Sequence, residues 1–180
     1  MSELERVFKT IEGYRDKIIE LQADLTSKVA LGPENGGTGE HDKAEYLKPK
    51  LEELGPDLME EIKAPDERAR DGYRPNLLAK WNGEQEGSTT WILSHMDIVP
   101  PGDPSLWEGD PYQIKVDGDR IIGRGVEDNQ HGIVSSYLAL QAVRESKGRL
   151  TRSVGLVLVA DEETGSLFGL DYLLKKGIYS

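Results

Sequence analysis

Hydrophobic residues in the first third of the chain recur with a helical period. Over residues 3–30 the apolar positions are spaced three and four residues apart, and Ser2 with Glu5 has the pattern of an N-terminal capping box. We therefore expect one or two helices in this stretch. A further helix is expected over 41–54, because Gly-Pro follows it directly.

From residue 58 onward, short apolar runs alternate with turn residues, as is typical of strands. The run 153–160 is apolar at consecutive positions, which indicates a central strand buried on both faces. Strands alternating with helices predict an α/β fold, with a mostly parallel mixed sheet flanked by helices. The expected strands are 58–64, 76–81, 89–94, 112–116, 120–122 and 153–160, and the later helices are 133–143 and 166–176.

Composition excludes several classes of protein and site. The net charge is −11, with 33 acidic and 22 basic residues, so we expect no nucleic-acid partner. The absence of cysteine excludes disulfides, a thiolate zinc site and a cysteine nucleophile. The longest apolar stretch, 154–160, is far shorter than the roughly 20 residues that span a bilayer. The N-terminus is charged throughout, so we expect a cytoplasmic protein without a membrane partner.

Three clusters of acidic and imidazole side chains lie where a predicted strand ends or a helix begins, the edge at which open α/β sheets bind ligands. In the first cluster, His95-Met96-Asp97, residues i and i+2 of an extended chain point to the same side. His95 can then offer its imidazole to a metal while Asp97 lies within reach of the other ring nitrogen. The alternative is a histidine that is simply hydrogen-bonded at a strand end.

The second and third clusters add carboxylates. Asp128 follows a Gly-rich turn and precedes a helix near Asn129, where a carboxylate is favoured, and taken alone this residue is better explained as an ordinary N-cap. Asp161, Glu162 and Glu163 follow the most hydrophobic strand, and adjacent carboxylates beside a dry core need compensating cations or hydrogen bonds. The alternative for this cluster is a solvated acidic loop.

Together the clusters supply ligands that suit zinc or a similar divalent ion. Their order, SHMD (94–97), WEGDPYQIKVDGDRIIGRGVED (107–128) and ADEETGS (160–166), resembles the M20 metallopeptidase family over roughly residues 74–175. That family includes acetylornithine deacetylase, succinyl-diaminopimelate desuccinylase, aminoacylase, carboxypeptidase G and carnosinase-type dipeptidases. The resemblance implies hydrolysis of an amide bond in a small peptide or an N-acyl amino acid.

The resemblance also implies a role for each matching residue. His95 would ligate one of two zinc ions and Asp97 would orient it. Asp128 would bridge the two ions, Glu163 would ligate the second, and Glu162 would be the general base. Cobalt or manganese are the alternatives to zinc.

Two departures from the family pattern affect this interpretation. The family often shows D-x-K-G after the bridging aspartate, whereas this chain has Gln130 at the lysine position and His131 at the glycine position. We expect His131 on the surface and assign no role to His41. Family members are also about twice as long, with a lid and dimerisation domain and further ligands near the C-terminus. We therefore expect residues 1–180 to be the N-terminal part of a catalytic domain, inactive alone, from a protein that forms a homodimer through the missing domain.

Two other functions remain open at this point. One is a non-catalytic interaction module that keeps the fold, against which the intact Glu162–Glu163 pair argues. The other is an aminopeptidase of a related dinuclear zinc family, in which paired glutamates also occur. The 107–128 stretch favours the M20-type hydrolase over both.

Overall fold

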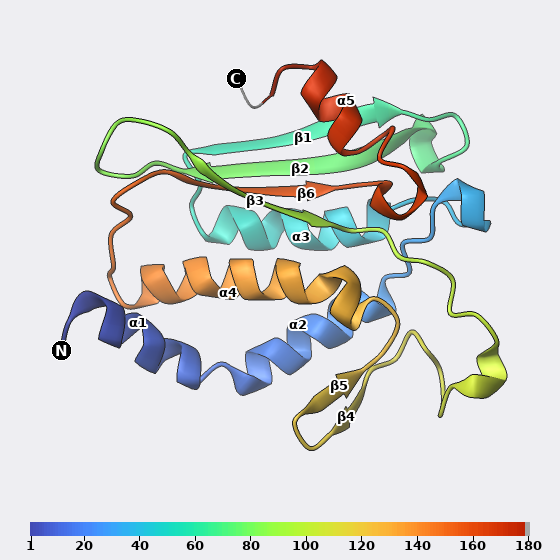
Figure 1. Cartoon of the computed structure of the whole chain (residues 1–180), viewed down its shortest axis with the longest axis horizontal. Helices are drawn as coiled ribbons and strands as arrows, with labels where there is room; N and C mark the ends of the chain where they lie inside the picture. The colour runs from blue at the N-terminus through green and yellow to red at the C-terminus, as the bar shows by residue number, and fades with distance from the viewer. Residues whose placement is uncertain (179–180) are drawn as a thin grey trace.

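The computed structural model describes residues 1–178, which form a mixed sheet covered by helices (Figure 1). A separate two-stranded hairpin projects from this body (Figure 1). The sheet has the order β1-β2-β6-β3, with β1 at Leu58–Pro65, β2 at Tyr73–Trp81, β6 at Val154–Val159 and β3 at Thr90–His95. The hairpin pairs β4 (Lys115–Asp117) with β5 (Arg120–Ile122) around Asp117-Gly118, as the sequence predicts.

The mixed α/β sheet is confirmed, but parallel pairing is less common in it than expected. Only β3 and β6 run parallel, whereas β1 with β2 and β2 with β6 are antiparallel. The connections explain the difference. A short segment joins β1 to β2 and can only reverse the chain, whereas the β3-to-β6 connection contains the crossover helix that parallel strands require.

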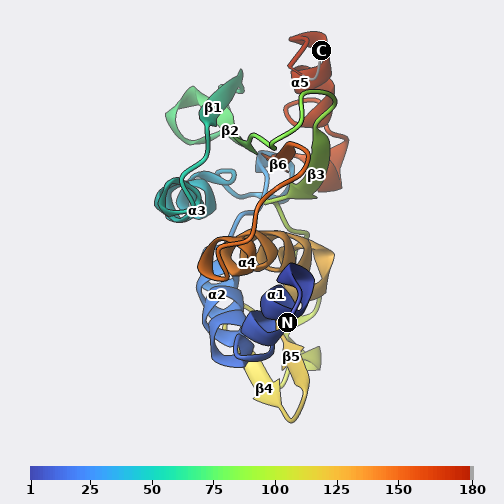
Figure 2. The same cartoon turned by 90° about the vertical axis from the view of Figure 1, so that its left-hand side faces the viewer.

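The helices lie in layers on the two faces of the sheet. Helices α3 (His41–Glu53) and α4 (His131–Glu145) cover one face, and the short α5 (Leu170–Lys175) lies on the other (Figure 2). Helices α1 (Glu3–Glu12) and α2 (Arg15–Ser27) pack against α4 on the side away from the sheet (Figures 1 and 2). At the start of α1 the capping box is confirmed, since the Ser2 hydroxyl accepts from the Glu5 amide at 3.2 Å and the Glu5 carboxylate accepts from the Ser2 amide at 2.7 Å.

Strand β6 is buried on both faces, as its sequence predicts. Leu156 and Leu158 belong to the core that the helical layer covers, while Val157 and Val159 belong to a second core under α5. Close packing also explains Gly155, because an added Cβ would lie 2.1 Å from ring atoms of Trp91. A larger residue at this position would therefore collide with β3.

The start of helix α5 differs from the sequence prediction. Helix α5 begins at Leu170 rather than at 166, because Ser166 has a left-handed backbone (φ 61°) and belongs to the preceding turn.

Among residues 1–178, β3 is an edge strand that pairs with β6 alone. Its Ile92 and Leu93 are 37% and 41% exposed. Within the same residues, no helix has the length and apolar character needed to cross a membrane.

Candidate metal centre

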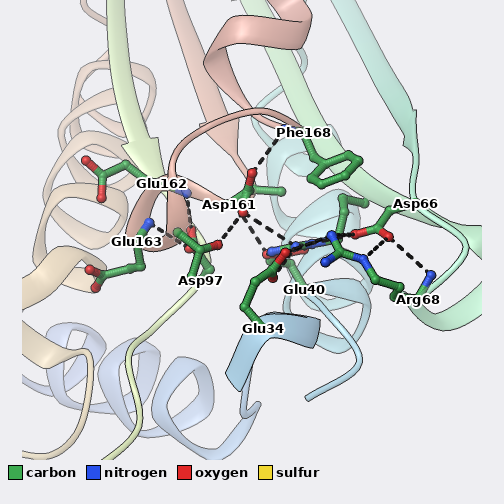
Figure 3. Close-up of polar contacts among 12 residues, drawn as sticks. Glu34, Glu40, Asp66, Arg68, Asp97, Asp161, Glu162, Glu163 and Phe168 are labelled. Atoms are coloured by element: carbon green, nitrogen blue, oxygen red, sulfur yellow. Dashed lines mark hydrogen bonds and ion pairs between the residues drawn. The ribbon is translucent and has the colours of Figure 1, made fainter. Parts of the chain in front are cut away.

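The parallel pairing of β3 and β6 brings two of the three predicted clusters together. His95 is the last residue of β3 and lies opposite Val159, so the chain after each strand emerges at one edge of the sheet. Asp97 follows β3, and the turn carrying Glu162 and Glu163 follows β6 (Figure 3). The edge at which the strands end is therefore the site that the sequence indicated.

The His95 ring is buried and contacted at both nitrogens. Its Nδ1 lies 3.1 Å from the main-chain oxygen of Asp97, so we assign the Nδ1 proton to that hydrogen bond. Its Nε2 lies 3.0 Å from Asp128 Oδ1 and 3.8 Å from Glu162 Oε2. A ring nitrogen that donates to a main-chain carbonyl, as Nδ1 does here, is usual in metal-ligating histidines, and it leaves Nε2 as the nitrogen that could bind a metal.

Three predicted metal ligands converge at this point. His95, Asp128 and Glu163 each offer one ligand atom, and these atoms all lie within 4.8 Å of one another. An imidazole and two carboxylates form a donor set that suits zinc and related divalent ions. The residues present therefore fit a metal ion, and their roles as ligands remain predictions.

Asp97 contacts more than the histidine that it was expected to orient. Its Oδ1 lies 3.5 Å from His95 Nδ1, and its carboxylate also accepts hydrogen bonds from the amides of Glu162 at 3.1 Å and Glu163 at 2.9 Å (Figure 3). Burial raises the pKa of Asp97, but His95 and the two amides outweigh this effect and hold the pKa below its usual value. The ionised carboxylate thus ties the end of β3 to the turn after β6.

The three consecutive carboxylates of that turn lie in three different environments. Asp161 is 1% exposed, and its Oδ1 lies 3.6 Å from Arg74 Nη1. The Glu162 side chain is 48% exposed at the rim of the site. Glu163 is partly buried, and burial together with the Asp128 carboxylate raises its pKa. The alternative interpretation as a solvated acidic loop therefore does not describe this turn.

The segment around Asp128 differs from the sequence prediction. Asp128 does not cap a helix, because it lies within an irregular turn over Val126–Gln130 (φ −115°, ψ 96°) and α4 begins only at His131, with Gln130 as the residue before it. The Gln130 side chain is buried, and its Oε1 accepts from the Thr26 hydroxyl at 2.9 Å. His131 is exposed, as predicted.

Sequence reasoning missed two charged residues beside the site. Arg74 and Glu40 are both fully buried and form an ion pair behind the Asp161 turn. The signal that could have revealed Arg74 is its place at the start of an apolar strand, where an unpaired charge would be costly. His41, to which no role was assigned, is buried and packs edge-on against Tyr73 with ring centroids 4.7 Å apart.

We expect metal affinity to rise with pH. In the metal-free protein burial lowers the pKa of His95, but the carboxylates of Asp97 and Asp128 outweigh burial and raise the pKa to about 9. A metal ion must displace that proton, so affinity should increase about tenfold per pH unit below pH 9 and level off above it. Cobalt titrations at pH 6, 7 and 8 measure this, and equal affinity at the three pH values would contradict it.

Comparison with known proteins places the chain among metallohydrolases and peptidases. Residues 91–179 match the family model described as peptidase family M20/M25/M40. An uncharacterized metallohydrolase of Methanococcus maripaludis is 41% identical over 165 residues, which are 88% of this chain and 39% of that protein. A succinyl-diaminopimelate desuccinylase of Gluconobacter oxydans is 38% identical over 107 residues, 57% of this chain and 27% of the enzyme.

Solved structures show the same fold. The dipeptidase Dug1p of Saccharomyces cerevisiae superposes with a TM-score of 0.81 at 21% identity, covering 98% of this chain and 38% of the dipeptidase. The chain thus spans well under half the length of each of these three proteins.

Proposed function

The chain belongs to peptidase family M20/M25/M40, and from that premise we propose that it carries part of the catalytic site of a metal-dependent hydrolase of amide bonds. The observation that carries this proposal is the convergence of His95, Asp128 and Glu163 within 4.8 Å at the edge where β3 and β6 end. An interaction module would not need this donor set, nor a half-exposed glutamate beside it.

Two divalent ions would be held here, zinc first and cobalt or manganese as alternatives. We assign His95 to one ion, Glu163 to the other, and Asp128 to both as a bridge. When bound, the ions would polarise the amide carbonyl and lower the pKa of water. Three ligands leave both ions incompletely coordinated, so we propose that the remaining ligands come from a part of the protein outside residues 1–180.

Glu162 is the proposed general base. Its carboxylate lies 3.8 Å from His95 Nε2, and the Asp97 carboxylate holds its main-chain amide. From this position the Glu162 carboxylate can take a proton from the attacking water and pass the same proton to the leaving amine. The half-exposed side chain leaves room for water and substrate on its outer side.

The proposed substrate is a small peptide or an N-acyl amino acid. Two of the similar proteins support this class, one being named a desuccinylase and the other a dipeptidase. We further propose that residues 1–180 are the N-terminal part of the catalytic domain, and that a lid domain elsewhere in the protein sets acyl-group selectivity and forms a homodimer.

Zinc titration tests this assignment and the ligand count together. Calorimetry on the 180-residue chain should give weak uptake or fewer than two ions, because residues 1–178 bring three candidate ligands together, and no hydrolysis of N-acyl amino acids. The full-length protein should bind two ions and hydrolyse members of an N-acyl amino acid and dipeptide panel. Tight uptake of two ions by the short chain would contradict the ligand count. Failure of the zinc-loaded full-length protein on the whole panel would contradict the function.

A further inference from the structure

A buried ion cluster lies directly behind the turn that carries Glu162 and Glu163 (Figure 3). Arg74, near the start of β2, is its centre. The Arg74 Nε donates to Glu40 Oε2 at 2.8 Å, and Nη2 donates to Glu40 Oε1. Its Nη1 lies 3.6 Å from Asp161 Oδ1. All three side chains are at most 2% exposed, and Asp66 and Glu34 also place carboxylate oxygens 3.8 and 3.7 Å from Arg74 Nη1, so the guanidinium is the shared partner of a buried acidic cluster.

The cluster also binds the main chain of the turn. The Glu40 carboxylate accepts from the Asp161 amide at 3.3 Å. The Asp161 carboxylate accepts from the Thr164 hydroxyl and, at 3.1 Å, from the Phe168 amide. The Asp161 carboxylate therefore stabilises the loop through hydrogen bonds within it, while Arg74 and Glu40 fix the position of Asp161.

A neighbour of Arg74 on the same strand holds both ends of this loop. The Asn76 side-chain oxygen accepts from the Ala160 amide at 3.0 Å, and its nitrogen donates to the Phe168 main-chain oxygen at 2.9 Å. The Phe168 ring in turn lies over the Arg74 guanidinium, 5.9 Å from the ring centroid. The loop from Ala160 to Phe168 is thus fastened to β2.

The backbone of the loop needs such support. Asp161 and Ser166 have φ values of 62° and 61°, a left-handed conformation that non-glycine residues adopt only when the surroundings over-determine it. The left-handed residue Asp161 immediately precedes Glu162 and Glu163. Its conformation therefore sets the direction in which the two glutamates leave β6.

We propose that Arg74 is a positioning residue for the metal centre, acting through Glu40 and Asp161 to aim Glu162 and Glu163 toward His95. This inference rests on the proposed function for the identity of the site that is positioned. A buried ion pair that merely stabilised the fold would lower stability when removed and leave the geometry of the site unchanged.

Substitutions in the full-length protein separate the two roles. Arg74→Met should weaken zinc affinity about 10- to 100-fold, as is common when a partner behind a metal ligand is lost, and should change the visible spectrum of the cobalt-substituted protein. Arg74→Lys should fall between wild type and Arg74→Met, because a lysine cannot make both hydrogen bonds to Glu40. The control is Leu51→Ala, a buried residue in the last turn of α3, at the end of that helix away from Glu40. It should lower the unfolding midpoint yet keep zinc affinity within about twofold, because its cavity lies at the far end of the helix from the ion cluster.

Hydrogen exchange of the metal-free protein gives a readout that does not depend on metal. Amides of residues 161–168 should exchange at least about tenfold faster in the Arg74 variants than in wild type, while those of α4 change less. If Arg74→Met does not fold, Arg74→Lys supplies the same comparison. Wild-type zinc affinity and cobalt spectrum in a folded Arg74 variant would overturn the proposal. If the wild-type protein bound no metal the proposed function would fail, and unchanged exchange at 161–168 would overturn the positioning role separately.

Discussion

Glu162→Gln in the full-length protein should lower kcat by about 100- to 10,000-fold, the usual contribution of a general base, while zinc content stays at the wild-type value. Glutamine has nearly the same shape but cannot accept the proton from water. Its main-chain amide would still donate to Asp97, so the turn should keep its conformation. The measurements are steady-state hydrolysis of an N-acyl amino acid and metal analysis of the same sample.

A matched control makes this result specific to the position. Glu52→Gln, an identical change at an exposed site near the end of α3, should leave both turnover and zinc content unchanged. Turnover near the wild-type rate in Glu162→Gln, with zinc fully bound, would show that another group takes the proton.

His95→Ala should remove at least one of the two ions from the full-length protein and abolish measurable turnover. The imidazole is the only nitrogen donor among the three converging groups, and its loss leaves carboxylates alone. Asp128→Ala should be more severe and lose both ions, because the bridging carboxylate serves both sites. Metal content after gel filtration, followed by hydrolysis with zinc added back, measures each effect.

The histidine control lies close by in sequence. His131→Ala removes an imidazole of the same size from an exposed position three residues after Asp128, and should leave two bound ions. Loss of metal in His131→Ala, or full metal content in His95→Ala, would contradict the ligand assignment.

The convergence of the site could be predicted from sequence because each cluster follows a strongly patterned element. The apolar run of β6 identified a central strand, and its parallel neighbour β3 ends in His95, so their ends had to meet at one edge. The resemblance to a known family supplied the separate role of each residue, which pattern alone left open.

Other parts of the site depended on contacts between segments far apart in sequence. Asp97 was expected to orient His95, but its hydrogen bonds to the Glu162 and Glu163 amides exist only once β3 and β6 are aligned. Likewise, the irregular turn that holds Asp128 contacts α2 through Gln130 and Thr26, more than 100 residues apart in sequence. The sequence indicated that the carboxylate of residue 161 needs a compensating partner, but nothing local in the sequence identifies that partner as Arg74.

The exposed side of β3 has a consequence for handling the 180-residue chain. Within residues 1–178, β3 lies at the edge of the sheet and two of its aliphatic residues, Ile92 and Leu93, are partly exposed, so this edge can accept another strand by main-chain hydrogen bonding. Two copies of the chain could therefore associate along this edge at high concentration. Self-association of this kind would align neighbouring molecules through β3, so dilute samples suit the metal titrations better than concentrated ones.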